Sequence, residues 1–396
     1  MKKILLLLVL SLLSISVSWG QKAEMMRIDS LLTRSRYNEA LMLVQSLLIK
    51  SPNDDVLKAK MGDILAELGD ARGAVVQYER VSRDFEPREI IDRKLAIQNY
   101  RLGKHHEALG YLQSIFSRGD TTFVDCDLAG RIFGYFLEMD SAIYFQRKAV
   151  GLVPGNAGNV IRLVNNFQAI KEVDSALYYA SSYLRYDSTN IALRGIRGLQ
   201  YYNLNKIDSA YQDFRVAYDQ GDLSPNTLYY YGLCLKAKSK FVDAKNVFLL
   251  GDTVTQGKNP WILLELGLLT QQGFLHPTSP VEYFRRAEEA MQPDSALFMK
   301  VQQGLGLSLL SEQKYGESIK HWENVLQKEP NHPQATYALG MIYGQRKNKK
   351  QEKRYYERFL KLAANDPRIS KEYAVLIQNV KERLNTIKEE EFMTRK

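Results

Sequence analysis

The chain has 396 residues, of which 45% are hydrophobic and 25% are charged, and its formal net charge is +9. A hydrophobic fraction of this size is ordinary for a folded protein, and no low-complexity linker interrupts the chain. The two cysteines are too few for a disulfide framework, which excludes the class of small disulfide-held folds.

Residues 1–20 have the pattern of a secretory signal peptide. Two lysines precede an apolar stretch at 4–10, and the small residues Ser18 and Gly20 occupy the positions that a signal peptidase reads. We therefore expect cleavage before Gln21 and an exported product, periplasmic in a bacterial cell envelope. The apolar stretch is short for a membrane span, which needs about 20 residues. An uncleaved N-terminal membrane anchor is the alternative.

An alanine then recurs every 34 residues. It stands at Ala40, Ala74, Ala108, Ala142, Ala176, Ala210 and Ala244. Twelve residues before it glycine is frequent, as at Gly62, Gly130, Gly198 and Gly232. A period of 34 is that of an array of helix–turn–helix units. The sequence therefore predicts an all-α fold whose function is to hold something.

These units resemble tetratricopeptide repeats. The family pattern has Leu-Gly and an aromatic residue in the first helix, Ala and an aromatic residue in the second, and Pro in the closing turn. The matching residues are Leu339, Gly340 and Tyr343 in one unit; Leu305, Gly306, Tyr315, Trp322 and Pro330 in another; and Gly130, Phe133, Ala142, Ala149 and Pro154 in a third. The resemblance covers nearly everything after residue 20, with scattered departures such as Asn99. It implies a right-handed superhelical solenoid of about ten helix pairs, in which first helices line the concave wall.

Packing explains the repeated residue types. Antiparallel helices approach closely only where side chains are small, so Gly on the first helix and Ala on the second are expected to form the contact. Larger residues three or four positions away fill the gaps beside it. Proline in the turn between units, as at Pro52, Pro154 and Pro330, stops one helix before the next begins.

The repeat array is predicted to span 21–366. Its units start near residues 21, 55, 89, 123, 157, 191, 225, 260, 299 and 333. The period lengthens by six residues between Ala244 and Ser318, largely around Gln271 to Pro280, where Gly and two Pro cannot continue a helix. Unit eight is therefore predicted to contain a longer turn. Pro367 then breaks the chain, and residues 367–396 are predicted to form a capping helix and tail that cover the end of the array.

No residue pattern indicates catalysis. The five histidines lack the spacing of a metal site, and neither a phosphate-binding loop nor a nucleophile elbow occurs. We therefore predict no catalytic residue, no metal and no cofactor, and a protein that is not an enzyme. Cys126 and Cys234 lie three units apart, too far for a disulfide, and are predicted to be unpaired and buried.

The concave wall is the predicted binding surface. Positions five, nine and twelve of each first helix form one stripe, because residues at i, i+4 and i+7 share a helix face. In the middle units the stripe and its neighbours carry Tyr, Arg and amide side chains, which suit protein or peptide recognition. The candidate partner-binding residues are Arg93, Tyr100, Arg131, Tyr135, Asn165, Gln168, Tyr202, Tyr229 and Lys236. Asp127 is the only acid on the stripe in those units, which is poor material for catalysis.

A basic segment lies near the end of the array. From Arg346 to Lys361 the sequence has eight Lys or Arg against two Glu. Its candidate docking residues are Arg346, Lys347, Lys349, Lys350, Lys353 and Arg354. They would contact an anionic membrane surface, an acidic polymer or an acidic protein, and the alternative is a solvated helix face. Nucleic acid is not an expected partner, because the chain is predicted to be exported and has no recognisable nucleic-acid motif.

The sequence thus predicts a non-enzymatic scaffold or adaptor that binds another cell-envelope protein or peptide through the concave groove. The alternative is an envelope glycan-binding protein that uses the same groove, since aromatic rings stack on sugars and amides bond to hydroxyls. By resemblance, outer-membrane glycan-binding proteins on a related helical scaffold carry a lipid-anchoring cysteine after the signal peptide. No such cysteine is present here, which disfavours the alternative. The oligomeric state stays open.

Overall fold

The computed structural model describes residues 22–119, 121–273, 279–291 and 297–393. The predicted signal peptide at 1–20 lies outside the described residues, as does part of the predicted longer turn, at 274–278. By its internal contacts the chain divides into two compact units, Met1–Asn190 and Ile191–Lys396. The described residues of both units form helices and turns, without a strand.

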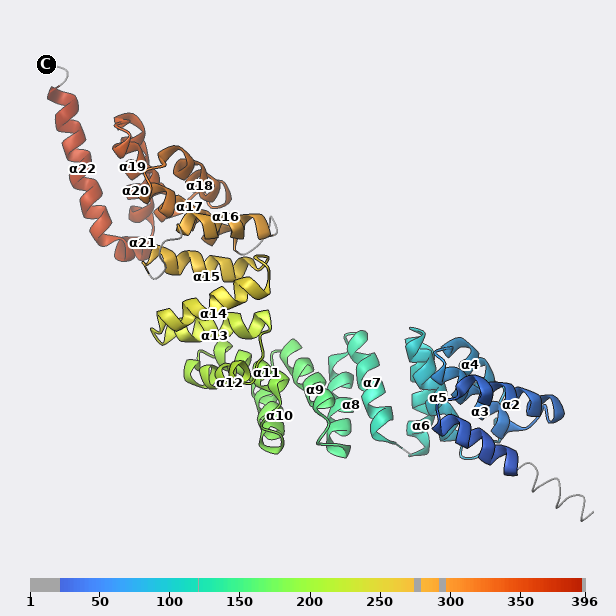
Figure 1. Cartoon of the computed structure of the whole chain (residues 1–396). Helices are drawn as coiled ribbons and strands as arrows, with labels where there is room; N and C mark the ends of the chain where they lie inside the picture. Colours follow the sequence, from blue (N-terminus) through green and yellow to red (C-terminus); the bar gives the residue numbers. More distant parts are fainter. Residues whose placement is uncertain (1–21, 120, 274–278, 292–296, 394–396) are drawn as a thin grey trace, which may run out of the picture. The chain divides into compact units, whose positions relative to one another are not determined.

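In the unit Met1–Asn190, residues 22–33 form a helix that precedes a series of antiparallel pairs. The helices are α2 Tyr37–Lys50, α3 Asp55–Glu67, α4 Ala71–Glu79, α5 Arg88–Arg101, α6 His105–Arg118, α7 Phe123–Tyr135, α8 Met139–Leu152, α9 Ala157–Ala169 and α10 Val173–Tyr186. From α3 on, each odd-numbered helix packs most extensively on the even-numbered helix that follows it (Figure 1).

The unit Ile191–Lys396 continues the same pairing. Its helices are α11 Ile191–Asn203, α12 Ile207–Asp219, α13 Pro225–Ala237, α14 Phe241–Val254, α15 Pro260–Gln271, α16 Pro280–Ala290, α17 Phe298–Ser311, α18 Tyr315–Lys328, α19 Pro333–Gln345, α20 Lys349–Asn365, α21 Pro367–Glu372 and α22 Ala374–Met393. Proline occupies the first turn of α13, α15, α16 and α19, where its missing N–H leaves no helical hydrogen bond unmade. The prediction of an all-α chain of consecutive helix pairs is confirmed.

The recurring alanines lie in the core of both units. Each of the seven is at most 1% exposed, and Ser318, the residue at the equivalent position after the longer turn, is fully buried. Ser318 keeps its hydroxyl satisfied by donating to the carbonyl of Gly306, 2.6 Å away. The small-residue positions therefore serve packing, as the sequence indicated.

Most of the recurring glycines of the first helices meet rings from the second helices, whereas Gly130 meets the side chain of Gln146. A Cβ atom added to Gly306 would lie 2.7 Å from the indole of Trp322, and one added to Gly340 would lie 2.5 Å from the ring of Tyr356. In each case the ring stands sixteen residues after the glycine. Close contact between the paired helices thus requires glycine and a large ring together.

The last helix covers the end of the array. After α20, Asp366 accepts a hydrogen bond from the backbone N–H of Arg368 at 2.8 Å and caps the short helix α21. The chain breaks again at Tyr373, and α22 packs on α20. This contact buries Tyr356, Phe359, Val380, Leu384 and Ile387 in one apolar cluster.

The departures from the repeat pattern are accommodated locally. Asn99 is buried, and its side-chain amide donates to the carbonyl of Leu95 at 2.9 Å, one helical turn earlier. Cys126 and Cys234 are both unpaired and buried, in agreement with the prediction. Burial raises the pKa of each thiol, so neither is an activated nucleophile.

Candidate binding groove

Aromatic and amide side chains line a groove in the unit Ile191–Lys396. It is a cavity of 410 Å³ formed by the first helices of three successive pairs. Its walls are Tyr202 and Asn203 of α11; Asn226, Tyr229, Tyr230 and Leu233 of α13; and Asn259 and Trp261 at the start of α15. We call this cavity the aromatic groove. It brings together Tyr202 and Tyr229, two of the residues predicted from the stripe.

The rings of the aromatic groove hold one another in place. The centroids of Tyr202 and Tyr230 are 5.3 Å apart and those of Tyr229 and Tyr230 are 5.2 Å apart, both edge to face. Trp261 follows at 6.2 Å from Tyr229 and remains 37% exposed. Such aromatic pairs are favourable and restrict the side chains. The groove therefore presents a preformed apolar surface to a ligand.

The phenols of Tyr202 and Tyr229 stay protonated. Burial raises the pKa of Tyr202 and of Tyr229, and the carboxylate of Glu265 adds to both shifts. A neutral phenol both donates and accepts a hydrogen bond. The exposed amides of Asn203 and Asn226 supply further donors and acceptors beside the rings.

Lys236, the third predicted residue of this unit, forms an ion pair with Glu265 of α15. The side chain of Lys236 is 22% exposed and that of Glu265 only 10% exposed. The pair therefore joins the first helices of two successive repeats and is largely shielded from water. A partner that used Lys236 would have to compete with Glu265 for it.

An apolar cavity of 220 Å³ adjoins the aromatic groove along α11 and α13. The two cavities share Asn226 and Tyr230. The other lining residues of the apolar cavity are Ile191, Ala192, Gly195, Ile196, Leu199, Phe214, Asp222, Ser224 and Thr227. An extended ligand along these helices would meet an apolar site and then an aromatic site with amides.

In the unit Met1–Asn190, Arg93 lies in a two-pronged ion pair with Asp125. The Nε and Nη2 atoms of Arg93 are each 2.8 Å from one carboxylate oxygen of Asp125, which is fully buried. Asp125 also accepts from the backbone N–H of Thr122 at 2.9 Å in a capping box at the start of α7. Arg93 thus ties α5 to α7, and its guanidinium is already committed within the fold.

Tyr100, Arg131 and Tyr135 lie near one another on α5 and α7. The guanidinium of Arg131 stands 4.7 Å from the ring centroid of Tyr100 and donates to its hydroxyl at 3.0 Å. His105 lies between the tyrosines, with its ring 5.2 Å from Tyr100 and 4.3 Å from Tyr135. Tyr135 is 67% exposed, so it remains accessible to a partner.

The two predicted amides lie on α9 and differ in their surroundings. Asn165 is exposed, whereas Gln168 is half-buried and its Nε2 has no hydrogen-bond partner within the described part of the chain. An amide N–H that is buried without a partner is costly, and the buried Nε2 of Gln168 is out of reach of a ligand in this conformation. The exposed Asn165 is therefore the better placed of the two to bind a peptide carbonyl.

Carboxylates neutralise more of the basic side chains on the first helices than the residues of the stripe predict. Asp63 accepts from Lys94 at 2.6 Å and from the hydroxyl of Tyr78 at 2.8 Å, and Asp127 is 2.7 Å from Arg162. Asp125 and Glu265 stand at the third and sixth positions of their first helices, so they do not belong to the stripe of positions five, nine and twelve. The stripe alone therefore missed the carboxylates that neutralise its arginines and lysines.

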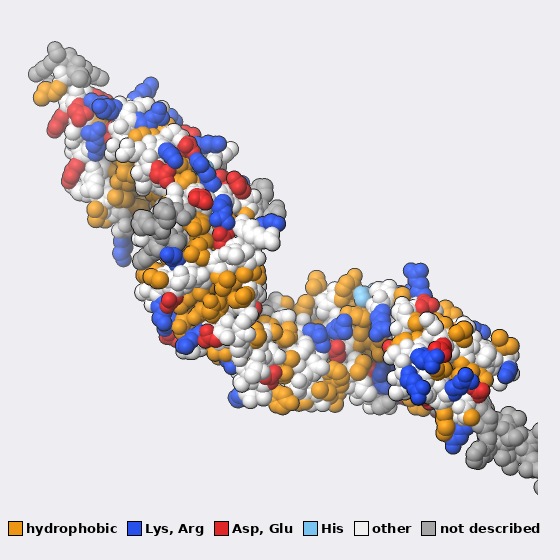
Figure 2. All heavy atoms as spheres, in the orientation of Figure 1, with side chains coloured by type: hydrophobic (Ala, Val, Ile, Leu, Met, Phe, Trp, Pro, Cys, Tyr) orange, Lys and Arg blue, Asp and Glu red, His pale blue; other side chains and the backbone are white. Residues whose placement is uncertain are grey.

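The basic segment is partly neutralised by the capping helix. Lys349 is 2.9 Å from Glu390, and Lys353 is 3.1 Å from Glu391. The other four predicted docking residues, Arg346, Lys347, Lys350 and Arg354, are exposed. Figure 2 shows blue and red side chains interspersed at the C-terminal end of the chain. The excess of positive charge seen in the sequence from 346 to 361 is thus reduced by acids that lie about forty residues further on.

Trp261 and Asn226 are two of the groove residues that the stripe did not include; Asn203, Tyr230 and Asn259 are the others. Trp261 and Asn226 both stand at the second position of a first helix, one turn before the fifth position. Extending the helical spacing backwards by three residues would have identified them, because positions two, five, nine and twelve share one face.

Within the ranges 22–119, 121–273, 279–291 and 297–393, no helix is both long enough and apolar enough to span a bilayer. In the same residues, no three His, Cys, Asp or Glu side chains gather in a way that could hold a metal ion.

Residues 304–367 match a family model described as tetratricopeptide repeat. No curated protein matches the chain. Among solved structures, a crystal structure of the MamA protein has 17% identity and a TM-score of 0.38, over 42% of this chain and 91% of that one. A structure of MamA AMB-1 has 14% identity and a TM-score of 0.39, over 44% and 96%.

The antiparallel helix pairs with their 34-residue register define a helical-repeat protein. The family match identifies residues 304–367 as tetratricopeptide repeat, and the other helix pairs of both units have the same antiparallel helical-repeat fold. Helical-repeat folds of this kind present extended surfaces for protein interaction.

Proposed function

We propose that this protein is a non-enzymatic adaptor of the cell envelope that holds an extended segment of another protein in the aromatic groove. The observation that carries the proposal is the meeting of Tyr202, Tyr229 and Trp261 with the exposed amides of Asn203 and Asn226. Aromatic side chains anchor protein interfaces because they bury large areas with few rotors. Amide groups can pair with a peptide backbone beside them.

The adjoining apolar cavity supports a polypeptide as the ligand. A chain laid along α11 and α13 would place one side chain in the apolar cavity and the next residues against the aromatic rings. A polypeptide supplies apolar side chains and backbone amides in alternation, whereas a sugar chain supplies hydroxyls at every unit. The glycan alternative is therefore the less favoured use of the same groove.

A pull-down tests the adaptor proposal. The mature protein, residues 21–396, is crosslinked mildly in an envelope extract, and the captured material is identified by mass spectrometry. We expect a reproducible envelope protein whose capture falls at least tenfold with Tyr229→Ala and with Tyr202→Ala. The matched control is Tyr178→Ala, which removes a tyrosine that is 63% exposed on α10.

Two results would contradict the proposal. Equal capture by the groove variants and by Tyr178→Ala would remove the groove from partner binding. Recovery of polysaccharide without a protein partner would favour the glycan alternative.

The envelope location rests on the signal-peptide pattern of residues 1–20. N-terminal sequencing of the protein from its native cells checks it. A chain that begins at Gln21 supports export with cleavage, and a membrane-bound chain that retains residues 1–20 supports the uncleaved anchor.

The four exposed basic residues at Arg346, Lys347, Lys350 and Arg354 suit a contact with an anionic membrane surface or polymer. Binding of the mature protein to vesicles with anionic lipid should fall steeply with added salt, because exposed charges are screened beyond about 10 Å at 0.1 M. Salt-insensitive binding, or equal binding to neutral vesicles, would exclude this role.

A further inference from the structure

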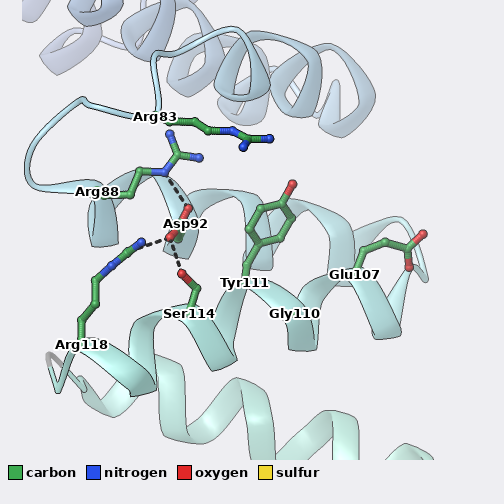
Figure 3. Close-up of a pocket in the computed structure, with 8 residues that line it drawn as sticks. All are labelled: Arg83, Arg88, Asp92, Glu107, Gly110, Tyr111, Ser114 and Arg118. Carbon is green, nitrogen blue, oxygen red and sulfur yellow. Dashed lines mark hydrogen bonds and ion pairs between the residues drawn. The ribbon is translucent and has the colours of Figure 1, made fainter.

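A second cavity lies in the unit Met1–Asn190, away from the predicted stripe. It has a volume of 480 Å³ and is lined by Arg83, Arg88, Asp92, Glu107, Gly110, Tyr111, Ser114 and Arg118. On α5 it uses Arg88 and Asp92, whereas the stripe on that helix uses Arg93, Ile97 and Tyr100. We refer to it as the arginine cavity (Figure 3).

An early helix end creates the arginine cavity. Helix α4 has nine residues, whereas the second helix of the next pair, α6, has fourteen. The chain leaves α4 at Arg80 and crosses to α5 in a loop that is anchored by the buried Val81 and by Phe85 against the core. Gly110 on α6 adds no side chain to the space, since a Cβ there would meet nothing within 4 Å. The loop therefore spans an opening that a longer α4 would fill.

Asp92 fixes two guanidinium groups at one end of the cavity. It is 3% exposed, and its oxygens accept from the Nε of Arg88 at 2.9 Å and from the Nη1 of Arg118 at 2.8 Å. Ser114 donates to the same carboxylate at 3.2 Å. Arg88 donates in addition to the carbonyl of Ser82 at 3.2 Å. The two arginines are therefore held in place before any ligand arrives, which lowers the entropic cost of binding.

Arg83 completes the site from the loop. It has no ion pair among the described residues, and Figure 3 shows it across the opening from the hydroxyl of Tyr111. Burial raises the pKa of Tyr111, so its phenol stays a hydrogen-bond donor. Glu107 lies at the far end of the cavity from Arg118 (Figure 3). Positive charge thus gathers at one end and a single acid stands at the other.

We propose that the arginine cavity binds a carboxylate of a polypeptide ligand, with Arg83 closing on it from the loop. Among the residues that line the cavity, the three arginines exceed Asp92 and Glu107 by one charge, and Glu89 lies 3.8 Å from Arg118 in addition. So small an excess of positive charge matches a singly charged carboxylate better than a doubly charged phosphate. Guanidinium and carboxylate groups also share a planar geometry that allows paired hydrogen bonds. The carboxylate can come from an acidic side chain or from a chain terminus.

Fluorescence anisotropy with three labelled Gly-Ser peptides tests the proposal on the mature protein. The first has an internal glutamate and an amidated end, the second has glutamine in its place, and the third has no acidic side chain and a free C-terminal carboxylate. We expect binding of the first peptide if the cavity takes an acidic side chain, or of the third if it takes a chain terminus. The glutamine peptide should bind at least tenfold more weakly than whichever of these two binds. Inorganic phosphate should compete no better than acetate at equal concentration.

Variants separate the site from general charge effects. Arg83→Gln should weaken binding at least tenfold, and Arg83→Lys should retain part of it. Arg80→Gln, which removes a nearby exposed arginine outside the cavity, should leave binding unchanged. The proposal is overturned if no peptide binds, if the glutamine peptide binds equally, if phosphate competes better than acetate, or if Arg80→Gln is as harmful as Arg83→Gln. Tyr229→Ala should not alter this binding, so the result is independent of the aromatic groove.

Discussion

The backbone of Gly232 on α13 lies directly against the ring of Phe248 on α14. A Cβ atom at residue 232 would be 2.4 Å from Cε1 of that ring, well inside van der Waals contact. Phe248 is fully buried and belongs to the largest apolar cluster of its unit. The ring therefore cannot move aside without disturbing its neighbours, and glycine is the residue that permits this helix pair to close.

Gly232→Ala should lower the free energy of unfolding by about 1–3 kcal/mol, the usual cost of overpacking a well-filled core. Urea unfolding followed by circular dichroism measures the change. The matched control is Gly110→Ala, in the middle of α6, where the new methyl group meets nothing. That change should be neutral or stabilising by up to about 1 kcal/mol, since alanine favours helix. Equal destabilisation by both variants would show that the close contact is not responsible.

Asp125→Ala should destabilise the fold by about 3–5 kcal/mol, because it leaves Arg93 without its buried partner and removes one of the two hydrogen bonds of the capping box of α7. Thermal or urea unfolding provides the measurement. Asp208→Ala is the control, since Asp208 pairs with Lys238 but its side chain is 87% exposed. Exposed pairs contribute roughly 0–1 kcal/mol. If Asp125→Ala lowers the free energy of unfolding no more than Asp208→Ala does, the Arg93–Asp125 pair does not hold α5 to α7.

Stability should fall as the pH drops below about 6.5, the ordinary pKa of histidine. Burial lowers the pKa of His321 and of His332, so the unfolded chain takes up protons more readily than the folded one. Their contribution to stability is present above the unfolded pKa and is lost as the pH falls through the folded pKa. His321 is held at 2.8 Å from the Oε1 of Gln302, which also accepts from Asn324.

Urea unfolding midpoints measured from neutral to mildly acidic pH check the predicted loss of stability. His321→Gln should lower stability at neutral pH and flatten the pH dependence between neutral and mildly acidic solution. His106→Gln, at an exposed position, should leave the slope unchanged. A slope that is identical in the wild type and in His321→Gln would contradict the assignment to His321.

The repeat could be predicted because its signal is local. Each recurring alanine and glycine must fit one contact between two helices that are adjacent in the chain, so the same residue type returns at each period. The ion pairs could not be predicted in the same way. Arg93 and Asp125 are 32 residues apart and occupy different positions of their helices, so their pairing depends on how one repeat is set against the next.

The candidate site was partly predictable for a similar reason. Tyr202 and Tyr229 follow from helical spacing alone, since one face of each first helix is read directly. Trp261 stands at the second position of its helix, three residues before position five, where the stripe begins. The arginine cavity has no sequence signal of its own, because it arises where α4 ends early and a loop of irregular structure replaces its last turn.

Tryptophan fluorescence can report occupancy of the aromatic groove. Within residues 21–396 the tryptophans are Trp261, which is 37% exposed, and Trp322, which is fully buried against Gly306. Acrylamide should therefore quench one part of the emission and spare the other. Trp261→Phe should abolish the quenchable part while keeping an apolar ring in the groove, so the loss of emission is separable from a loss of fold.

Once a partner is known, adding it should protect Trp261 from acrylamide and shift its emission to shorter wavelength, because burial removes water from the indole. A partner that binds tightly without changing the quenching of Trp261 would bind elsewhere on the chain.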